Sequence, residues 1–181
     1  MGKILSRGLL VSYLVILIWL VLFKTSFSLT ALLIHHHQRS LNLVPFAAPS
    51  IVDGQINYSE MILNCVLFIP LGLLLNVNFK KAGFLRRLFF ILAFSVTVEL
   101  LQYIFAIGAT DITDVITNTS GGFLGLTFYR LSNKLISNEK LDRAIVSAGI
   151  ILFLVFISME ASHFIRRRDR MREPPPLRRT I

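Results

Sequence analysis

Residues Phe94–Gly125 read FSVTVELLQYIFAIGATDITDVITNTSGGFLG, two largely apolar runs joined by a turn with two carboxylates. Polar side chains interrupt both runs: Glu99 and Gln102 lie in the first, and Asn118 lies in the second. A charged side chain at the centre of a bilayer costs about 2.5–3.5 kcal/mol on insertion scales. Membrane proteins therefore keep such residues where they have a partner or a task.

The composition around this stretch is typical of a polytopic membrane protein. Of the 181 residues, 54% are hydrophobic and 16% are charged, and the mean hydropathy is +0.68. The net charge of +9 does not indicate nucleic-acid binding, because the Lys and Arg residues form short clusters between apolar runs, as topology signals do. The single cysteine, Cys65, cannot form an intramolecular disulfide.

The apolar runs predict an all-α transmembrane bundle of about five spans with a cytoplasmic N-terminus. The expected spans are Gly8–Phe23, Met61–Phe79, Leu88–Ile107, Val115–Leu131 and Ala144–Met159. This orientation puts the basic clusters that follow the second and fourth spans inside, and the acidic turn outside. A fifth span then places the basic tail outside, against the same rule, so the alternative is that the last apolar run does not cross.

Residues 1–165 are expected to form the transmembrane domain, with its main motifs in residues 39–131. Residues 166–181 form a basic tail with three consecutive prolines, which we expect to be disordered or extended. The longest loop, Lys24–Glu60, holds apolar patches at Leu29–Ile34 and Leu41–Phe46, which suit a segment lying on the membrane surface. Three adjacent histidines in this loop lack further ligands for a metal ion. We therefore expect no metal and no cofactor.

Pro and Gly residues mark expected packing features of two spans. Pro70 removes an amide from the middle of the second span and predicts a kink, with Gly72 close behind it. In the fourth span, the GxxxG spacing predicts a face on which a neighbouring backbone approaches closely. The residues of this face are Gly121, Gly122 and Gly125.

In the N-in orientation, polar residues of three spans converge on the outer half of the bundle. At about 1.5 Å per residue, Glu99 lies about 12 Å below the outer end of its helix and Gln102 about 8 Å. We expect Asp114 to cap the fourth span. The sequence thus predicts an outward-facing polar cavity formed by Asn64, Glu99, Gln102, Asp111, Asp114 and Asn118, with Arg39 and Asn42 contributed by the long loop.

A structural alternative stays open for these residues. Helix capping and a hydrogen bond between helices would also account for Asp114 and Asn118. Glu99 needs a partner or a proton, and Arg39 and Lys24 are the obvious basic residues on the outer side.

Four short segments occur in a specific order: Asn42–Phe46 (NLVPF), Asn64–Gly72 (NCVLFIPLG), Glu99–Gln102 (ELLQ) and Asp111–Asp114 (DITD), the last followed by Asn118 and the glycines. Together they resemble the VanZ-like family of bacterial membrane proteins. The resemblance covers about Arg39–Leu126. It implies a multi-pass protein of the bacterial plasma membrane, associated with resistance to teicoplanin, a glycopeptide that carries a lipid. Many relatives carry an arginine just before the acidic turn, where this chain has Ala106–Thr110 (AIGAT), so its site is more acidic than the family norm.

Three hypotheses of function follow. The first is a non-enzymatic protein that binds a lipid-linked envelope precursor or an amphiphilic ligand at the outer leaflet, with the lipid bilayer as its surroundings and no nucleic acid as partner. The second is an intramembrane enzyme with Glu99 as acid or base and Asp111 or Asp114 as its partner, although the sequence has no nucleophile motif. The third is a small transporter, although no internal repeat is present. The oligomeric state stays open.

Overall fold

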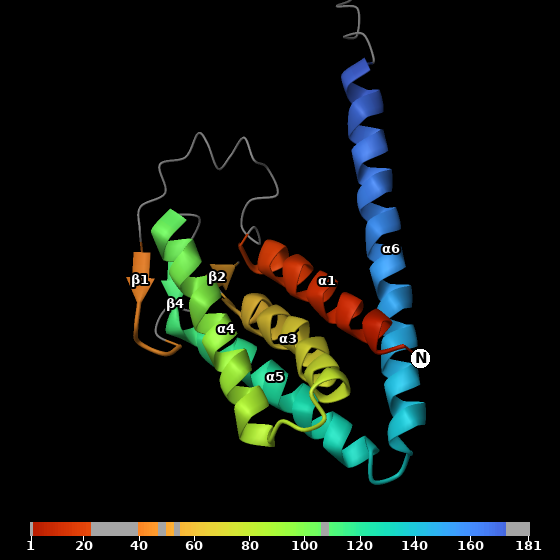
Figure 1. The fold of residues 1–181 in the computed structure, drawn as a ribbon. Coiled ribbons are helices and arrows are strands. Elements are labelled where there is room, and N and C mark those ends of the chain that lie inside the picture. The colour runs from red at the N-terminus through yellow and green to blue at the C-terminus, as the bar shows by residue number, and fades with distance from the viewer. Residues whose placement is uncertain (1, 23–39, 47–49, 53–54, 106–108, 173–181) are drawn as a thin grey trace, which may run out of the picture. The chain divides into compact units, whose positions relative to one another are not determined.

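A computed structural model describes residues 2–22, 40–46, 50–52, 55–105 and 109–172. In chain order, the elements are α1 (Lys3–Leu22), β1 (Ser40–Asn42), β2 (Ser50–Val52), β3 (Gln55–Asn57), α3 (Ser59–Asn78), α4 (Phe84–Phe105), β4 (Ala109–Asp111), α5 (Ile112–Ser132) and α6 (Asn138–Arg172) (Figure 1). The predicted all-α bundle is confirmed. Arg39, Lys24 and the patch Leu29–Ile34 lie outside the described residues.

Four of the described helices are long and apolar enough to cross a membrane: α1, α3, α4 and the part of α6 at Asn138–Met159. The helix α5, which covers the predicted fourth span, is not among them. Its polar and glycine residues lower its hydropathy, and ten of its 21 residues are buried. Its buried face carries the polar residues and the glycines, while Phe123, Leu124, Phe128 and Leu131 are exposed on its surface.

The glycine face of α5 lies directly against the backbone of α3. A methyl group added at Gly121 would collide with the carbonyl group of Cys65, and one added at Gly125 would collide with that of Ile69. Across the interface, Gly72 of α3 allows the same close approach. Residue numbers rise together along both helices in these contacts, so α3 and α5 run parallel. Such proximity gains many small dispersion contacts.

The helix α4 runs antiparallel to α5. Near its start, the side chain of Ile91 packs against Gly122. One turn later, Ser95 Oγ accepts a hydrogen bond from Asn118 Nδ2 at 3.0 Å. Large buried side chains fill the space between the helices, among them Leu17, Phe68, Leu71, Ile91 and Leu126.

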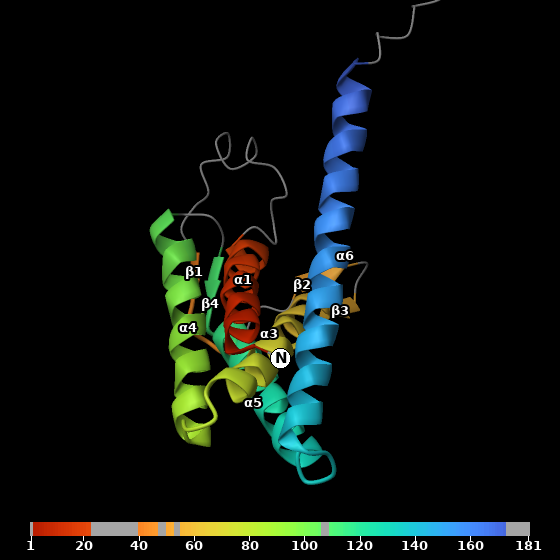
Figure 2. The same cartoon turned by 45° about the vertical axis from the view of Figure 1, so that its right-hand side comes forward.

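The helix α1 runs antiparallel to α3. Near the start of α1, the Ser6 carbonyl accepts a hydrogen bond from Asn78 Nδ2 at 3.2 Å, and further along, Tyr13 donates to the Leu67 carbonyl. Both views of the ribbon show these two helices side by side (Figures 1 and 2).

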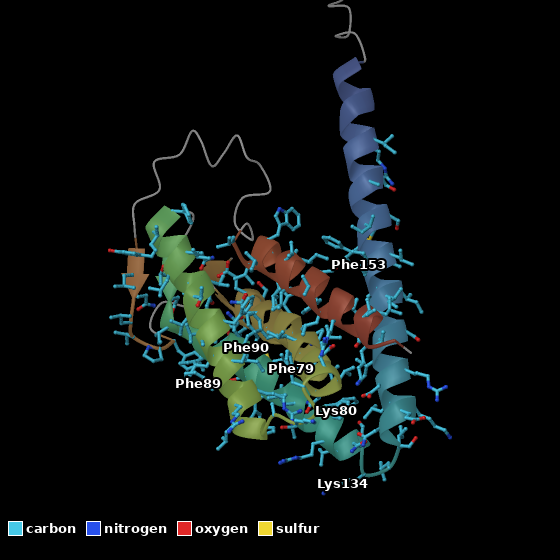
Figure 3. The ribbon with its side chains drawn as sticks, viewed as in Figure 1. Phe79, Lys80, Phe89, Phe90, Lys134 and Phe153 are labelled. Atoms are coloured by element: carbon cyan, nitrogen blue, oxygen red, sulfur yellow. The ribbon has the colours of Figure 1, made fainter. Side chains whose placement is uncertain are left out.

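These directions give the bundle two chemically different ends. One end gathers the end of α1, the start of α3, the end of α4 and the start of α5, and there β1 and β4 pair in parallel, with Asn42 opposite Asp111 (Figure 1). We call it the carboxylate end, because it holds Glu99, Asp111 and Asp114. The opposite end, which we call the basic end, holds Lys3, Arg7, Lys80, Lys81 and Lys134; Lys80 and Lys134 are labelled there in Figure 3.

Contacts divide the chain into two compact units, Met1–Val146 and Ser147–Ile181. The second unit contains the continuation of α6, whose apolar side chains are largely exposed, including Ile151, Leu152 and Leu154. The helix continues to Arg172, so residues 166–172 are helical where we expected disordered or extended chain.

Alanine at Gly121 or Gly125 is expected to destabilise the bundle, because the added methyl group meets backbone atoms of α3, which cannot rotate away. Overpacking of this kind costs about 1–3 kcal/mol. The matched control is Gly8→Ala in α1, where nothing lies within 4 Å of the added methyl group. Thermal unfolding in detergent should give lower midpoints for the two α5 variants and an unchanged or higher midpoint for Gly8→Ala. Equal midpoints for all three variants would contradict this packing.

Candidate functional site

The turn between α4 and α5 supplies the centre of the candidate site. Asp111 is the N-cap of α5, and its Oδ1 accepts a hydrogen bond from the Thr113 amide at 2.7 Å. The cap satisfies one of the amides that a first helical turn leaves unpaired. Our prediction that Asp114 is the cap is wrong. Asp114 lies within the first turn, where only 7% of its surface is exposed.

Glu99 holds the beginning of α5 against α4. Its side chain is 2% exposed, and Oε2 accepts a hydrogen bond from the Asp111 amide at 3.2 Å. The Glu99 backbone carbonyl accepts another from Thr110 Oγ1 at 3.1 Å. A backbone amide thus supplies part of the compensation that a buried carboxylate requires.

The segment 40–46 is held on the carboxylate end at several points. Asn42 Nδ2 donates to Asp111 Oδ2 at 3.1 Å, and Asn42 Oδ1 accepts from the Val44 amide at 3.1 Å. The Phe46 amide donates to Thr113 Oγ1 at 3.0 Å. Phe46 has a φ of 57°, in the left-handed region. That conformation costs on the order of 1 kcal/mol for a residue with a side chain, so the surrounding hydrogen bonds must hold it.

This segment presents large apolar side chains away from the protein. Leu41, Leu43, Val44 and Phe46 are each more than half exposed; we call these four residues the apolar strip. The strip is joined through Asn42 and the Phe46 amide to the polar groups at the start of α5. An exposed apolar surface and the half-buried Asp111 carboxylate therefore lie side by side.

Three buried amide side chains extend the polar site into the bundle. Gln102 Nε2 donates to the Val21 carbonyl at 3.0 Å, and Asn118 Nδ2 donates to Ser95. In the described part of the chain, Gln102 Oε1, Asn118 Oδ1 and Asn64 Nδ2 are buried without a hydrogen-bond partner. An unsatisfied buried polar atom costs about 1–3 kcal/mol. A water molecule or a polar ligand atom at these positions would remove that cost.

The structure brings two of the predicted residues, Asn42 and Glu99, into contact with a third, Asp111. Gln102 follows one turn after Glu99, and Asn118 follows one turn after Asp114. Sequence reasoning missed the roles of Thr110 and Thr113, whose hydroxyl groups connect these elements. The T-D-x-T-D pattern could have indicated them, because threonine hydroxyls often bond to nearby backbone groups. Within the described ranges, no three His, Cys, Asp or Glu side chains gather to hold a metal ion.

The Asn42–Asp111 contact can be measured with a double-mutant cycle. Asn42→Ala and Asp111→Ala should each lower stability, and their effects should fall short of additive by about 1 kcal/mol, because each removes the same hydrogen bond. Unfolding in detergent provides the free energies. The control cycle combines Asn42→Ala with Asn78→Ala at the basic end, which should be additive. If the effects of Asn42→Ala and Asp111→Ala on stability were additive, the segment 40–46 would not be held by the Asn42–Asp111 contact.

The chain has clear relatives. The family model described as VanZ/LLP1 matches residues 10–133. "Protein VanZ" of Enterococcus faecium is 59% identical over 157 residues, an alignment that covers 87% of this chain and 93% of that protein. No solved structure matches the chain. The resemblance inferred from four short motifs is confirmed, and the chain belongs to the VanZ/LLP1 family.

Proposed function

We propose that this chain is a multi-pass protein of the bacterial plasma membrane that binds an amphiphilic or lipid-linked molecule at its carboxylate end. Through that binding it lowers sensitivity to teicoplanin-type lipoglycopeptides. Family membership and the similarity to a protein named VanZ support the general assignment. The binding role depends on the geometry of the site.

The position of the apolar strip beside the carboxylates of Asp111 and Glu99 is the observation that carries the proposal. An amphiphile has a polar group and a hydrocarbon chain, and this end of the bundle offers a complementary surface for each. The strip exposes Leu43 and Val44. Beside it, Asp111 and Glu99 lie in surroundings where charge interactions are screened less than in water. The complementary polar group is therefore one with hydroxyl, amide or ammonium donors.

The charges of the two ends support an orientation with the carboxylate end outside. Lys and Arg residues concentrate on the cytoplasmic side of membrane proteins. The basic end holds Lys3, Arg7, Lys80 and Lys81, and the opposite end holds the acidic turn. In this orientation the candidate site meets the outer leaflet, where a lipid-bearing antibiotic arrives.

The carboxylates of the site are held in place by the protein itself. Both oxygens of Asp111 and Oε2 of Glu99 accept hydrogen bonds from backbone or side-chain donors. Each carboxylate oxygen has a second lone pair, so these positioned groups can still accept a hydrogen bond from a ligand. This preorganisation supports a binding role.

Removing one negative charge without changing shape tests the site. Glu99→Gln keeps an oxygen that can accept from the Asp111 amide, and Asp114→Asn is equally close in size. Each variant should weaken ligand binding by on the order of tenfold, the effect of losing about 1.4 kcal/mol. Teicoplanin should therefore inhibit cells that carry either variant at lower concentrations than cells with the unaltered protein.

Two controls make this experiment specific. Glu139→Gln removes a carboxylate whose side chain is 87% exposed on the first turn of α6, and it should leave sensitivity unchanged. The sensitivity of the cells to a glycopeptide without a hydrocarbon chain should change less with these variants than their sensitivity to teicoplanin does. Unchanged teicoplanin sensitivity with Glu99→Gln and Asp114→Asn at normal membrane levels would refute the site.

A further inference from the structure

A cavity of about 460 Å³ lies at the basic end, between the start of α1 and the connection from α3 to α4. Its polar lining consists of Lys3, Ser6, Arg7, Asn78, Lys80 and Lys81. The volume falls in the range of about 300–1,000 Å³ that is usual for small-ligand sites. Lys80 and its neighbour Phe79 are labelled in Figure 3.

Most of the positive charge in this cavity is not neutralised by the protein. Lys80 pairs with Asp142 at 2.7 Å and contacts the Tyr129 hydroxyl. Among the described residues, no carboxylate pairs with Lys3, Arg7 or Lys81, and none lines the cavity. Lys3 and Arg7 are four residues apart and so lie on the same face of α1, where like charges repel. An anion bound between α1 and the α3–α4 connection would remove this repulsion.

The backbone around the cavity also favours an anion. The helix α1 begins here with no acidic residue in its first turn, so the positive end of its dipole has no carboxylate in that turn to complement it. Carbonyls at the end of α3 would repel an anion, but two of them already accept hydrogen bonds. Leu74 O accepts from Asn78 Nδ2 at 2.9 Å, and Leu75 O accepts from the Phe79 amide at 2.9 Å.

We propose that this cavity binds the phosphate group of an anionic membrane lipid. Both α1 and α3 are candidate membrane spans, so the cavity lies where two helices leave the hydrocarbon layer. Phe79, which lines the cavity, is half exposed and offers apolar surface that an acyl chain can contact. Clustered basic residues at such a position recognise lipid headgroups in membrane proteins generally. This site is separate from the carboxylate end and does not depend on the function proposed there.

The test is a binding titration of the purified full-length protein in detergent. The probes are dioctanoyl phosphatidylglycerol, the phosphatidylcholine of the same chain length, and inorganic phosphate, each measured by calorimetry. Phosphatidylglycerol should bind more tightly than the zwitterionic lipid. The double substitution Arg7→Gln with Lys81→Gln should weaken that binding on the order of thirtyfold, as expected for two cationic contacts.

The matched control is Arg86→Gln with Lys134→Gln, which removes two exposed positive charges from outside the cavity lining. It should leave the affinity unchanged. The proposal would be overturned if both double substitutions lowered the affinity for phosphatidylglycerol equally, or if the two lipids bound equally tightly. Inorganic phosphate that binds as tightly as phosphatidylglycerol, with the same loss in the cavity variant, would keep the phosphate site but replace the lipid with a soluble anion. The double substitution Arg7→Gln with Lys81→Gln relieves the repulsion between the cations of the cavity. Its unfolding midpoint should therefore not fall, which separates a loss of binding from a loss of folding.

Discussion

The close contact between the backbones of α3 and α5 determines what the rest of this protein can do. Glycine at positions 121 and 125 lets α5 approach α3 to backbone distance. The dispersion energy of this contact helps to bury the polar and glycine face of α5. Because this face is buried, Asp114 and Asn118 can lie inside the bundle. If residues 121 and 125 carried side chains, α5 would have to move away from α3, and the polar site would open to lipid.

The direction of α5 then separates the two kinds of charge. Running parallel to α3, α5 begins beside the end of α4, so its N-cap meets Glu99. Its last turns lie at the opposite end of the bundle, where Tyr129 donates to Asp142 at 2.7 Å and contacts Lys80. One helix therefore connects the proposed amphiphile site to the edge of the proposed phosphate site. The first site offers carboxylates to a ligand, and the second offers cations.

The sequence predicted the helices well because an apolar run of this length indicates a membrane-spanning helix directly. The run Met61–Phe79 became α3 at Ser59–Asn78, and Leu88–Ile107 became α4 at Phe84–Phe105. The convergence of polar residues at one end was also predictable, since it follows from alternating helix directions. The small-residue spacing in α5 predicted close approach, but not that α3 is the partner.

Three features depended on contacts that no local pattern encodes. The pairing of β1 with β4 joins Asn42 to Asp111, 69 positions away. The cap of α5 falls on Asp111 rather than Asp114, because Glu99 and Asn42 hold Asp111 in an extended conformation. The third feature is the partner of the polar face of α5: the sequence shows polar residues and glycines in this helix, but not that α3 and α4 cover them.

The orientation of the bundle is the claim on which the proposed function most directly rests, and cysteine labelling measures it. In a Cys65→Ala background, single cysteines replace Leu43 in the apolar strip or Lys81 at the basic end. Intact cells are then treated with a membrane-impermeant maleimide. We predict labelling at position 43 in intact cells, and labelling at position 81 only after permeabilisation. Labelling of position 81 but not position 43 in intact cells would place the carboxylate end in the cytoplasm and contradict the account.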